Sequence, residues 1–189
     1  MIADFSPAFK SAIATGGASY ANAMKVGFQA NRRFWEEDAH IYGGISWTER
    51  DITQIWYPAV GFHQSKGVIV GAYIWDNPIS KRLAPLAPAE RLRQAIADGE
   101  TLHPGYGREV SVASGVSIAW EKIPYSRGGW IEWEESDRET AYRTLSEADD
   151  SIYLAGEHMS YLTGWQEGAI LSALQVVQKI STQLQAISA

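Results

Sequence analysis

Residues 151–180 read SIYLAGEHMSYLTGWQEGAILSALQVVQKI, and this stretch carries the clearest change of structural pattern in the chain. The apolar run at residues 152–155 is typical of a short buried strand. A polar and aromatic loop follows, and from about Trp165 onward the pattern predicts a long helix, because apolar residues recur at three- and four-residue steps. These apolar residues are Ile170, Leu174, Val177, Ile180 and Leu184. A strand that feeds a helix indicates an α/β or α+β fold.

The break between this strand and this helix contains residue types that a plain turn does not need. Ligands of α/β folds lie beyond the carboxyl ends of strands, where Gly156 and Glu157 stand, and a carboxylate there can accept hydrogen bonds from ligand hydroxyls. The helix start at Gly164-Trp165 offers free N–H groups and the positive end of the helix dipole. Gly168 has no Cβ, so a bulky group can lie close to the backbone. The alternative is a solvated Glu157 and glycines that serve only the turn and the helix packing.

Strand-like and helix-like segments also alternate in the rest of the chain. Ser6 can cap a first helix, residues 15–19 are typical of a loop, and Ser136 with Glu139 forms the pattern of a capping box. The almost continuous apolar run at 66–75 is the strongest strand signal and suits a sheet covered on both faces. We predict helices at 6–13, 87–104 and 136–148, strands or extended segments at 24–29, 52–58, 66–75 and 116–123, and a loop at 124–133.

Composition and charge exclude several classes of protein. The 189 residues are 46% hydrophobic and 12% aromatic, which is enough to build a core. The net charge of −6 argues against a nucleic-acid partner. There are no cysteines, so disulfides and thiolate chemistry are excluded. The four histidines show none of the usual metal-site spacings, and we expect no metal.

Hydropathy gives no sign of a membrane protein. The longest apolar run, at residues 67–75, is too short to span a bilayer. The start of the chain lacks the basic and apolar regions of a signal peptide. We therefore expect a cytoplasmic protein with no membrane partner. Eight tryptophans are unusual for a chain of this size and hint at a broad aromatic site, although large aromatics more often fill cores.

The segment IYLAGEHMSYLTGWQEGAILSA at 152–173 resembles the C-terminal flavin-binding signature of the flavin-containing amine oxidases, the family of monoamine, polyamine and L-amino-acid oxidases. That signature is an apolar strand, Ala-Gly-Glu, a loop, Gly-Trp or Gly-Tyr, a spacer and Gly-Ala. The resemblance covers about residues 5–185, and the upstream segments follow the order of the L-amino-acid-oxidase branch. These segments are KVGFQANRRFWEED (25–38), YGGISW (42–47), IWYP (55–58), GVIVGAY (67–73) and RGGW (127–130).

The resemblance implies FAD as cofactor and assigns roles at the C-terminal signature. Glu157 would hydrogen-bond ribityl or ribose hydroxyls of FAD. The segment from Gly164 to Ala169 would face the isoalloxazine, and its N–H groups would stabilise negative charge on the reduced flavin. Trp165 would form one wall of an aromatic cage around the substrate amine. The implied cofactor-binding residues are Gly156, Glu157, Gly164, Trp165, Gln166, Gly168 and Ala169.

The resemblance also implies a catalytic pair, Lys25 and Trp165, and substrate contacts at Tyr73, Trp130 and Trp165. Lys25 matches a lysine that holds a water near the flavin, and such a lysine would be desolvated. The alternative is a surface lysine. Tyr73 matches the tyrosine that binds the substrate carboxylate, or is a buried tyrosine bonded to the backbone. Trp130 matches a residue of the side-chain pocket, or covers the core from a loop. Trp75 is a weaker candidate of the same kind.

The dinucleotide fingerprint G-x-G-x-x-G of the family is absent from this sequence. We therefore expect the C-terminal portion of a larger flavoenzyme, as a truncated frame, a processed subunit or a repurposed piece. The expected fold is α/β (α+β): a substrate-binding mixed sheet with helices at 1–148, then the last strand and helix of an FAD-binding domain at 149–189. Alone, the chain should bind FAD poorly and expose apolar surface.

The resemblance implies an oxidation of an L-amino acid or amine. Hydride passes to flavin, the product imine hydrolyses, and O2 reoxidises the flavin to give hydrogen peroxide. An amino-acid 2-monooxygenase is a neighbouring alternative. A second hypothesis is a non-catalytic interaction module that holds no flavin. The expected partners are the substrate, O2, the missing N-terminal FAD-binding part or subunit, and a second copy in a homo-oligomer.

Overall fold

The computed structural model describes residues 4–75 and 77–187, and the chain divides into two compact units. The sheet unit is Asn22–Arg127. The helix unit combines Met1–Ala21 with Gly128–Ala189. Each unit has its own buried core. The expected division at residue 148 stays a prediction about the complete enzyme.

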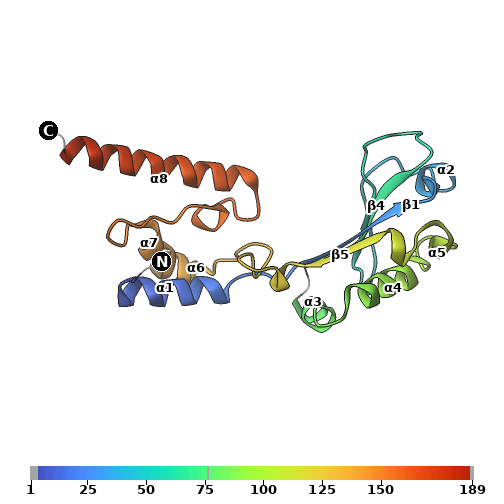
Figure 1. Ribbon diagram of the computed structural model, residues 1–189, viewed down its shortest axis with the longest axis horizontal. Helices are drawn as coiled ribbons and strands as arrows, with labels where there is room; N and C mark the ends of the chain where they lie inside the picture. Colours follow the sequence, from blue (N-terminus) through green and yellow to red (C-terminus); the bar gives the residue numbers. More distant parts are fainter. Residues whose placement is uncertain (1–3, 76, 188–189) are drawn as a thin grey trace. The chain divides into compact units, whose positions relative to one another are not determined.

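The described part of the sheet unit forms a five-stranded sheet in the order β2-β3-β4-β1-β5. Its strands are β1 (Met24–Ala30), β2 (Ile45–Trp47), β3 (Gln54–Trp56), β4 (Gly67–Ile74) and β5 (Gly115–Ala119). The α+β fold class is therefore confirmed. Every strand pair among the described residues is antiparallel, so the sheet is not mixed as expected. Figure 1 shows β1 beside β4 and β5.

A β-bulge interrupts the pairing of β1 with β4. Val26 lies opposite Ala72 and Gly27 lies opposite Val70, so Gly71 is an extra residue on β4. A Cβ on Gly71 would lie 2.6 Å from Cε2 of Phe28, which explains why this position is a glycine. Because side chains alternate along a strand, the extra residue places Val70 and Tyr73 on the same face of the sheet.

Helices cover one face of this sheet. Helix α4 (Pro88–Gly99) packs against β1, β4 and β5, and the buried residues of β4 are Ile69, Ala72 and Ile74. The core also takes in Tyr106, which starts α5 (Tyr106–Glu109). On the other face Val68 is 52% exposed. The prediction that residues 66–75 are covered on both faces is therefore wrong along β4, because Val68 is exposed and Val70 and Tyr73 are only partly buried on this second face, which we call the uncovered face.

The remaining sheet-unit elements are short. The strand predicted at 52–58 spans only β3, and the extended segment predicted at 116–123 ends as a strand at Ala119. The helix predicted at 87–104 ends at Gly99, where the chain turns toward α5. The short helical elements are α2 (Phe34–Glu37), α3 (Asn77–Leu83), η1 (Val112–Ser114) and η2 (Trp120–Lys122).

The helix unit begins with α1 (Pro7–Ala18), and Ser6 caps it as predicted by accepting from the Phe9 N–H at 3.3 Å. The loop predicted at 15–19 is wrong, because the helix continues through Gly16. A Cβ on Gly16 would lie 2.8 Å from the ring of Trp133, so the glycine permits close packing here. A small core joins this helix to the segments that follow; it contains Phe9, Ala12, Ala141, Leu145 and Met159.

The helix predicted at 136–148 begins and ends differently in the structure. It consists of α6 (Glu135–Asp137), the π-helical turn η3 (Arg138–Tyr142) and α7 (Arg143–Ser146). The N-cap residue is Glu134, with no side-chain capping bond, so the predicted capping box at Ser136 is wrong. The helix begins two residues earlier than the Ser136 cap predicted, because Glu134 and not Ser136 is the N-cap residue.

The strand predicted at 152–155 does not form; only an isolated bridge joins Asp149 to Ile152. A strand needs a neighbour to pair with, and the described helix unit provides none for these residues. The long helix is confirmed as α8 (Gln166–Ile187), preceded by η4 (Glu157–Met159). Figure 1 shows α8 as a long straight helix. No helix among the described residues is long and apolar enough to cross a membrane.

Candidate functional site

Lys25 and Tyr73 lie side by side on the uncovered face of the sheet. They are direct partners in the β1–β4 register, and Lys25 Nζ lies 4.2 Å from the centroid of the Tyr73 ring. This is a cation–π contact between residues 48 positions apart in the sequence. The structure thus brings together two of the residues that the sequence singled out.

A row of aromatic side chains continues from Tyr73 along the same face. The Tyr73 ring centroid lies 5.7 Å from that of Trp56 and 4.9 Å from that of Trp75. Trp47 lies 6.1 Å from Trp75 and extends the row to the sheet edge. Sequence reasoning missed Trp47 and Trp56 as site residues. Only part of this row could be predicted: Tyr73 and Trp75 stand two residues apart in the strand predicted at 66–75, so they should share a face.

Burial raises the pKa of the Tyr73 phenol above its ordinary value. The phenol is therefore neutral around neutral pH and can donate a hydrogen bond to an anionic group. Its main chain is held by Thr53, whose Oγ1 donates to the Tyr73 carbonyl at 2.6 Å. Lys25, by contrast, is exposed among the described residues of the sheet unit, and the desolvated setting expected for it stays a prediction.

The second group of predicted residues lies in the helix unit, where the chain enters α8. Glu157 Oε2 accepts a hydrogen bond of 2.7 Å from the Gly164 N–H, which closes the loop in front of the helix. The Gly156 N–H donates to Ser172 Oγ on α8 at 3.2 Å. Gly156 and Gly164 have backbone φ angles of 149° and 79°, which residues with a Cβ rarely adopt. These two glycines are therefore required by the path of the loop.

Gly168 allows close packing between α8 and the loop before it. A Cβ at this position would collide with the Leu162 carbonyl oxygen and with Ser160 Oγ. The space on this side of Gly168 is thus filled by the chain itself, and the expected contact of Gly168 with a cofactor stays a prediction. Gly168 instead lets the first turn of α8 press against the loop.

The remaining predicted residues surround the start of α8. Trp165 is 72% exposed, Gln166 is also exposed, and the Ala169 N–H donates to the Trp165 carbonyl at 3.3 Å. Trp130 lies against Gly164, where an added Cβ would be 3.4 Å from Trp130 Cγ. The structure therefore places Trp130 beside the loop that holds Glu157, although the two are far apart in the sequence.

The residues at the start of α8 suit a flavin. The first turn of a helix has N–H groups without intrahelical partners, and the dipole there favours a negative charge. The neighbouring exposed Trp165 provides an aromatic face, and the carboxylate of Glu157 can accept bonds from hydroxyl groups. This donor and acceptor set can hold a planar anionic ring system and a polyhydroxyl chain.

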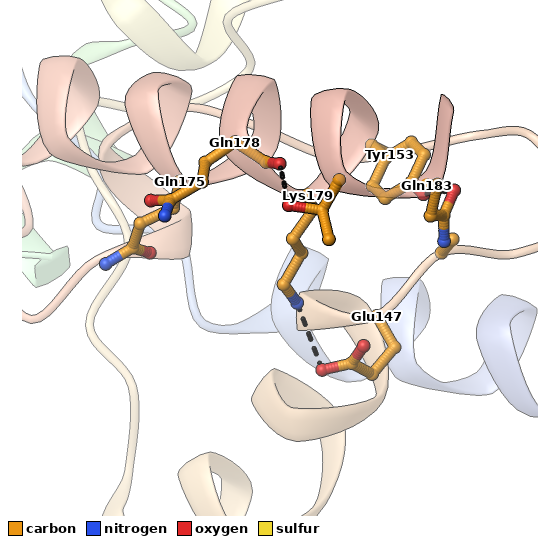
Figure 2. A pocket seen from close by; sticks show the side chains of 8 residues that line it. Glu147, Tyr153, Gln175, Gln178, Lys179 and Gln183 are labelled. Carbon is orange, nitrogen blue, oxygen red and sulfur yellow. Dashed lines mark hydrogen bonds and ion pairs between the residues drawn. The ribbon is translucent and has the colours of Figure 1, made fainter. Parts of the chain in front are cut away.

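A pocket of the helix unit lies away from these residues. It has a volume of about 520 Å³ and opens between α8 and the segment at 147–153 (Figure 2). Its polar side chains pair with one another: Lys179 Nζ lies 3.1 Å from Glu147, and Tyr153 Oη donates to Gln183 at 2.5 Å. None of its lining residues belongs to the predicted site. Among the described residues, no group of three or more histidine, aspartate or glutamate side chains could hold a metal ion.

A family model described as flavin containing amine oxidoreductase matches residues 3–181. The chain belongs to this family. Family membership implies a flavin cofactor and an oxidoreductase. The chain is 32% identical over 168 residues to the flavin-dependent L-tryptophan oxidase RebO of Lentzea aerocolonigenes, covering 85% of this chain and 34% of that protein.

Other relatives agree with this assignment. The chain is 32% identical over 163 residues to an L-amino-acid oxidase of Mus musculus, covering 86% of this chain and 25% of that protein. A solved structure of a putrescine oxidase double mutant has the same fold, with a TM-score of 0.68 and 16% identity over 85% of this chain and 35% of that one. The chain therefore spans about a third or less of the length of these relatives.

Proposed function

We propose that this chain provides the substrate-binding sheet and the flavin-contacting C-terminal helix of an FAD-dependent L-amino-acid oxidase. The observation that carries the proposal is the contact of Lys25 with Tyr73, 4.2 Å from Nζ to the ring centroid, on a sheet face lined with aromatic side chains. A cation and a phenol donor fixed side by side form a setting for an anionic group such as a substrate carboxylate. The names of the relatives, which are L-amino-acid oxidases, support the same substrate class.

The residues of the sheet unit have separate roles in this proposal. The neutral phenol of Tyr73 donates a hydrogen bond to the substrate carboxylate. Lys25 holds a water and can move a proton at its Nζ atom. Trp75 provides apolar surface beside Tyr73, which favours a large or aromatic substrate side chain.

The residues of the helix unit act on the cofactor. Bound FAD supplies the hydride-accepting chemistry that converts the amine to an imine, with O2 as the final electron acceptor and hydrogen peroxide as a product. Glu157 accepts hydrogen bonds from the ribose or ribityl hydroxyls. The start of α8 places N–H groups and the positive helix end toward the flavin ring. Trp165 and Trp130, which stand beside this helix start, would provide aromatic surface for the substrate amine.

A second candidate is a non-catalytic module that acts through apolar surface. It is favoured by the exposed apolar residues on α8, since Ile170, Leu174, Val177 and Leu184 are 56%, 60%, 63% and 60% exposed. Flavin absorption by the purified protein distinguishes the two candidates. A purified chain or complex that absorbs in the flavin bands supports the oxidase, whereas a folded protein that never takes up flavin supports the module.

The substrate role is tested by Tyr73→Phe in the flavin-loaded enzyme that contains this chain. We expect the KM for L-amino acids to rise about tenfold, the effect of losing one hydrogen bond to a charged group. The KM for the corresponding amines, which have no carboxylate, should stay unchanged. An unchanged KM for amino acids would remove Tyr73 from carboxylate binding.

A further inference from the structure

Gln54 is a buried polar residue on the same face of β3 as Trp56, and its burial needs an explanation. It is 0% exposed, and among the described residues its Nε2 has no hydrogen-bond partner. An unpaired buried amide group is costly, and a leucine of similar shape would avoid that cost. The bond that Gln54 does make is therefore the reason for an amide here. Its Oε1 accepts a hydrogen bond of 2.6 Å from the indole Nε1 of Trp56.

The orientation of this amide follows from chemistry. The indole N–H of Trp56 is a donor only, so it must face the amide oxygen of Gln54 and not the amide nitrogen. A fully buried side chain has few alternative rotamers. The bond thus ties a half-buried indole to a fully buried side chain two residues earlier on the same strand.

The indole in turn contacts the candidate catalytic face. The Trp56 ring is inclined at 58° to the Tyr73 ring, with centroids 5.7 Å apart. Thr53 holds only the main chain of Tyr73. The ring therefore depends for its orientation on the side chains beside it. Lys25 Nζ lies over this same ring.

We propose that Gln54 and Trp56 are positioning residues for the candidate substrate site. The buried amide of Gln54 fixes the Trp56 indole, the indole fixes the ring of Tyr73, and the ring sets the position of the Lys25 ammonium group. The geometry is independent of the assigned chemistry, but its catalytic consequence rests on the proposed function of Tyr73 and Lys25. Neither Gln54 nor Trp56 needs to touch the substrate in this arrangement.

The geometric part is tested by NMR on the 189-residue chain. The ring of Tyr73 should shift the ε-CH2 protons of Lys25 upfield, and Lys25→Arg assigns the signal. Trp56→Leu should move the signal most of the way toward the position of an exposed lysine, and Gln54→Leu should move it in the same direction. The matched control is Trp47→Leu, which removes a more exposed indole that has no ring contact with Tyr73 among the described residues and should leave the signal in place. An unchanged signal in a folded Trp56→Leu chain overturns the proposal.

The catalytic part is tested by a double-mutant cycle in the flavin-loaded enzyme. If Trp56 acts through Tyr73, Trp56→Leu should raise the KM for L-amino acids about tenfold, as Tyr73→Phe does. The double variant should then be no worse than Tyr73→Phe alone. Effects that multiply would show that Trp56 does not act through Tyr73 and overturn the inference. An unchanged KM in Tyr73→Phe overturns the proposed function instead, while the NMR result still decides the positioning.

Discussion

Replacing Gly168 by alanine gives a test in which two physical effects predict opposite signs. On helix propensity alone, alanine within α8 should stabilise the protein by about 1 kcal/mol. The structure predicts the reverse, because the new Cβ would collide with the Leu162 carbonyl and with Ser160 Oγ. One of these atoms belongs to the main chain, so the neighbour cannot turn away as a flexible side chain would.

The magnitude follows from what has to move. Overpacking of this kind costs about 1–3 kcal/mol. Ser160 Oγ accepts from the Leu162 N–H at 3.0 Å and donates to the Glu157 carbonyl at 2.8 Å, and displacing it loses about 1 kcal/mol for a hydrogen bond. After the propensity gain is subtracted, Gly168→Ala should lower the free energy of unfolding by about 1–3 kcal/mol.

The assay is urea unfolding followed by far-UV circular dichroism, with Gly17→Ala as the matched control. Gly17 also lies in a helix, α1, but a Cβ there has nothing within 4 Å. Gly17→Ala should therefore stabilise by up to about 1 kcal/mol. At a typical urea dependence, a loss of about 2 kcal/mol lowers the midpoint by roughly 1 M. A Gly168→Ala variant that is stabilised as much as Gly17→Ala would refute the packing argument.

Three further predictions address the pH dependence, the cofactor and the bulge. Burial lowers the pKa of His103, whose Nε2 lies 2.6 Å from Tyr57 Oη, so the folded state favours the neutral ring. As the pH drops below about 6.5, the unfolded state takes up a proton before the folded state does, so the free energy of unfolding should fall. A His103→Gln variant should lose this part of the pH dependence in urea titrations at several pH values. An unchanged dependence of stability on pH would contradict the assignment to His103. Glu157→Ala should raise the FAD dissociation constant of the assembled enzyme about 10- to 100-fold, because a hydrogen bond to a charged group contributes about 1.5–3 kcal/mol. Flavin fluorescence measures this constant. An unchanged constant would contradict a role of Glu157 in FAD binding and leave it only its hydrogen bond to the loop. Gly71→Ala should lower the melting temperature by roughly 2–10 °C through overpacking of the core, and calorimetry showing no change would count against the bulge geometry.

Sequence patterns predicted the elements whose signal is local. Strands β1 and β4 and helices α4 and α8 were predicted because their periodicity runs over seven or more residues within one segment. The start of α1 was predicted from the Ser6 cap for the same reason. The family was predicted from a dense motif at 152–173, whose glycines and glutamate have fixed spacing.

The errors arose where a distant part of the chain decides the outcome. Residues 152–155 are apolar enough for a strand, but a strand forms only beside a partner, and the described helix unit offers none. The helix runs through Gly16 because Trp133, far away in sequence, packs there. The contact of Trp56 with Tyr73 depends on the order of the strands, and the face that Tyr73 occupies depends on the bulge at Gly71. Neither follows from periodicity within one strand.

We propose that this chain is one part of a flavin-dependent amino-acid oxidase, and reconstitution of the enzyme from its parts is the decisive test. The chain is mixed with FAD, alone and together with a separately expressed dinucleotide-binding part of a related L-amino-acid oxidase. Quenching of flavin fluorescence and release of hydrogen peroxide are followed with a panel of L-amino acids. If the proposal is right, the mixture binds flavin and releases peroxide, and the Lys25→Met variant of the chain abolishes peroxide release. A folded chain that binds no flavin in either sample would contradict it and favour the non-catalytic module.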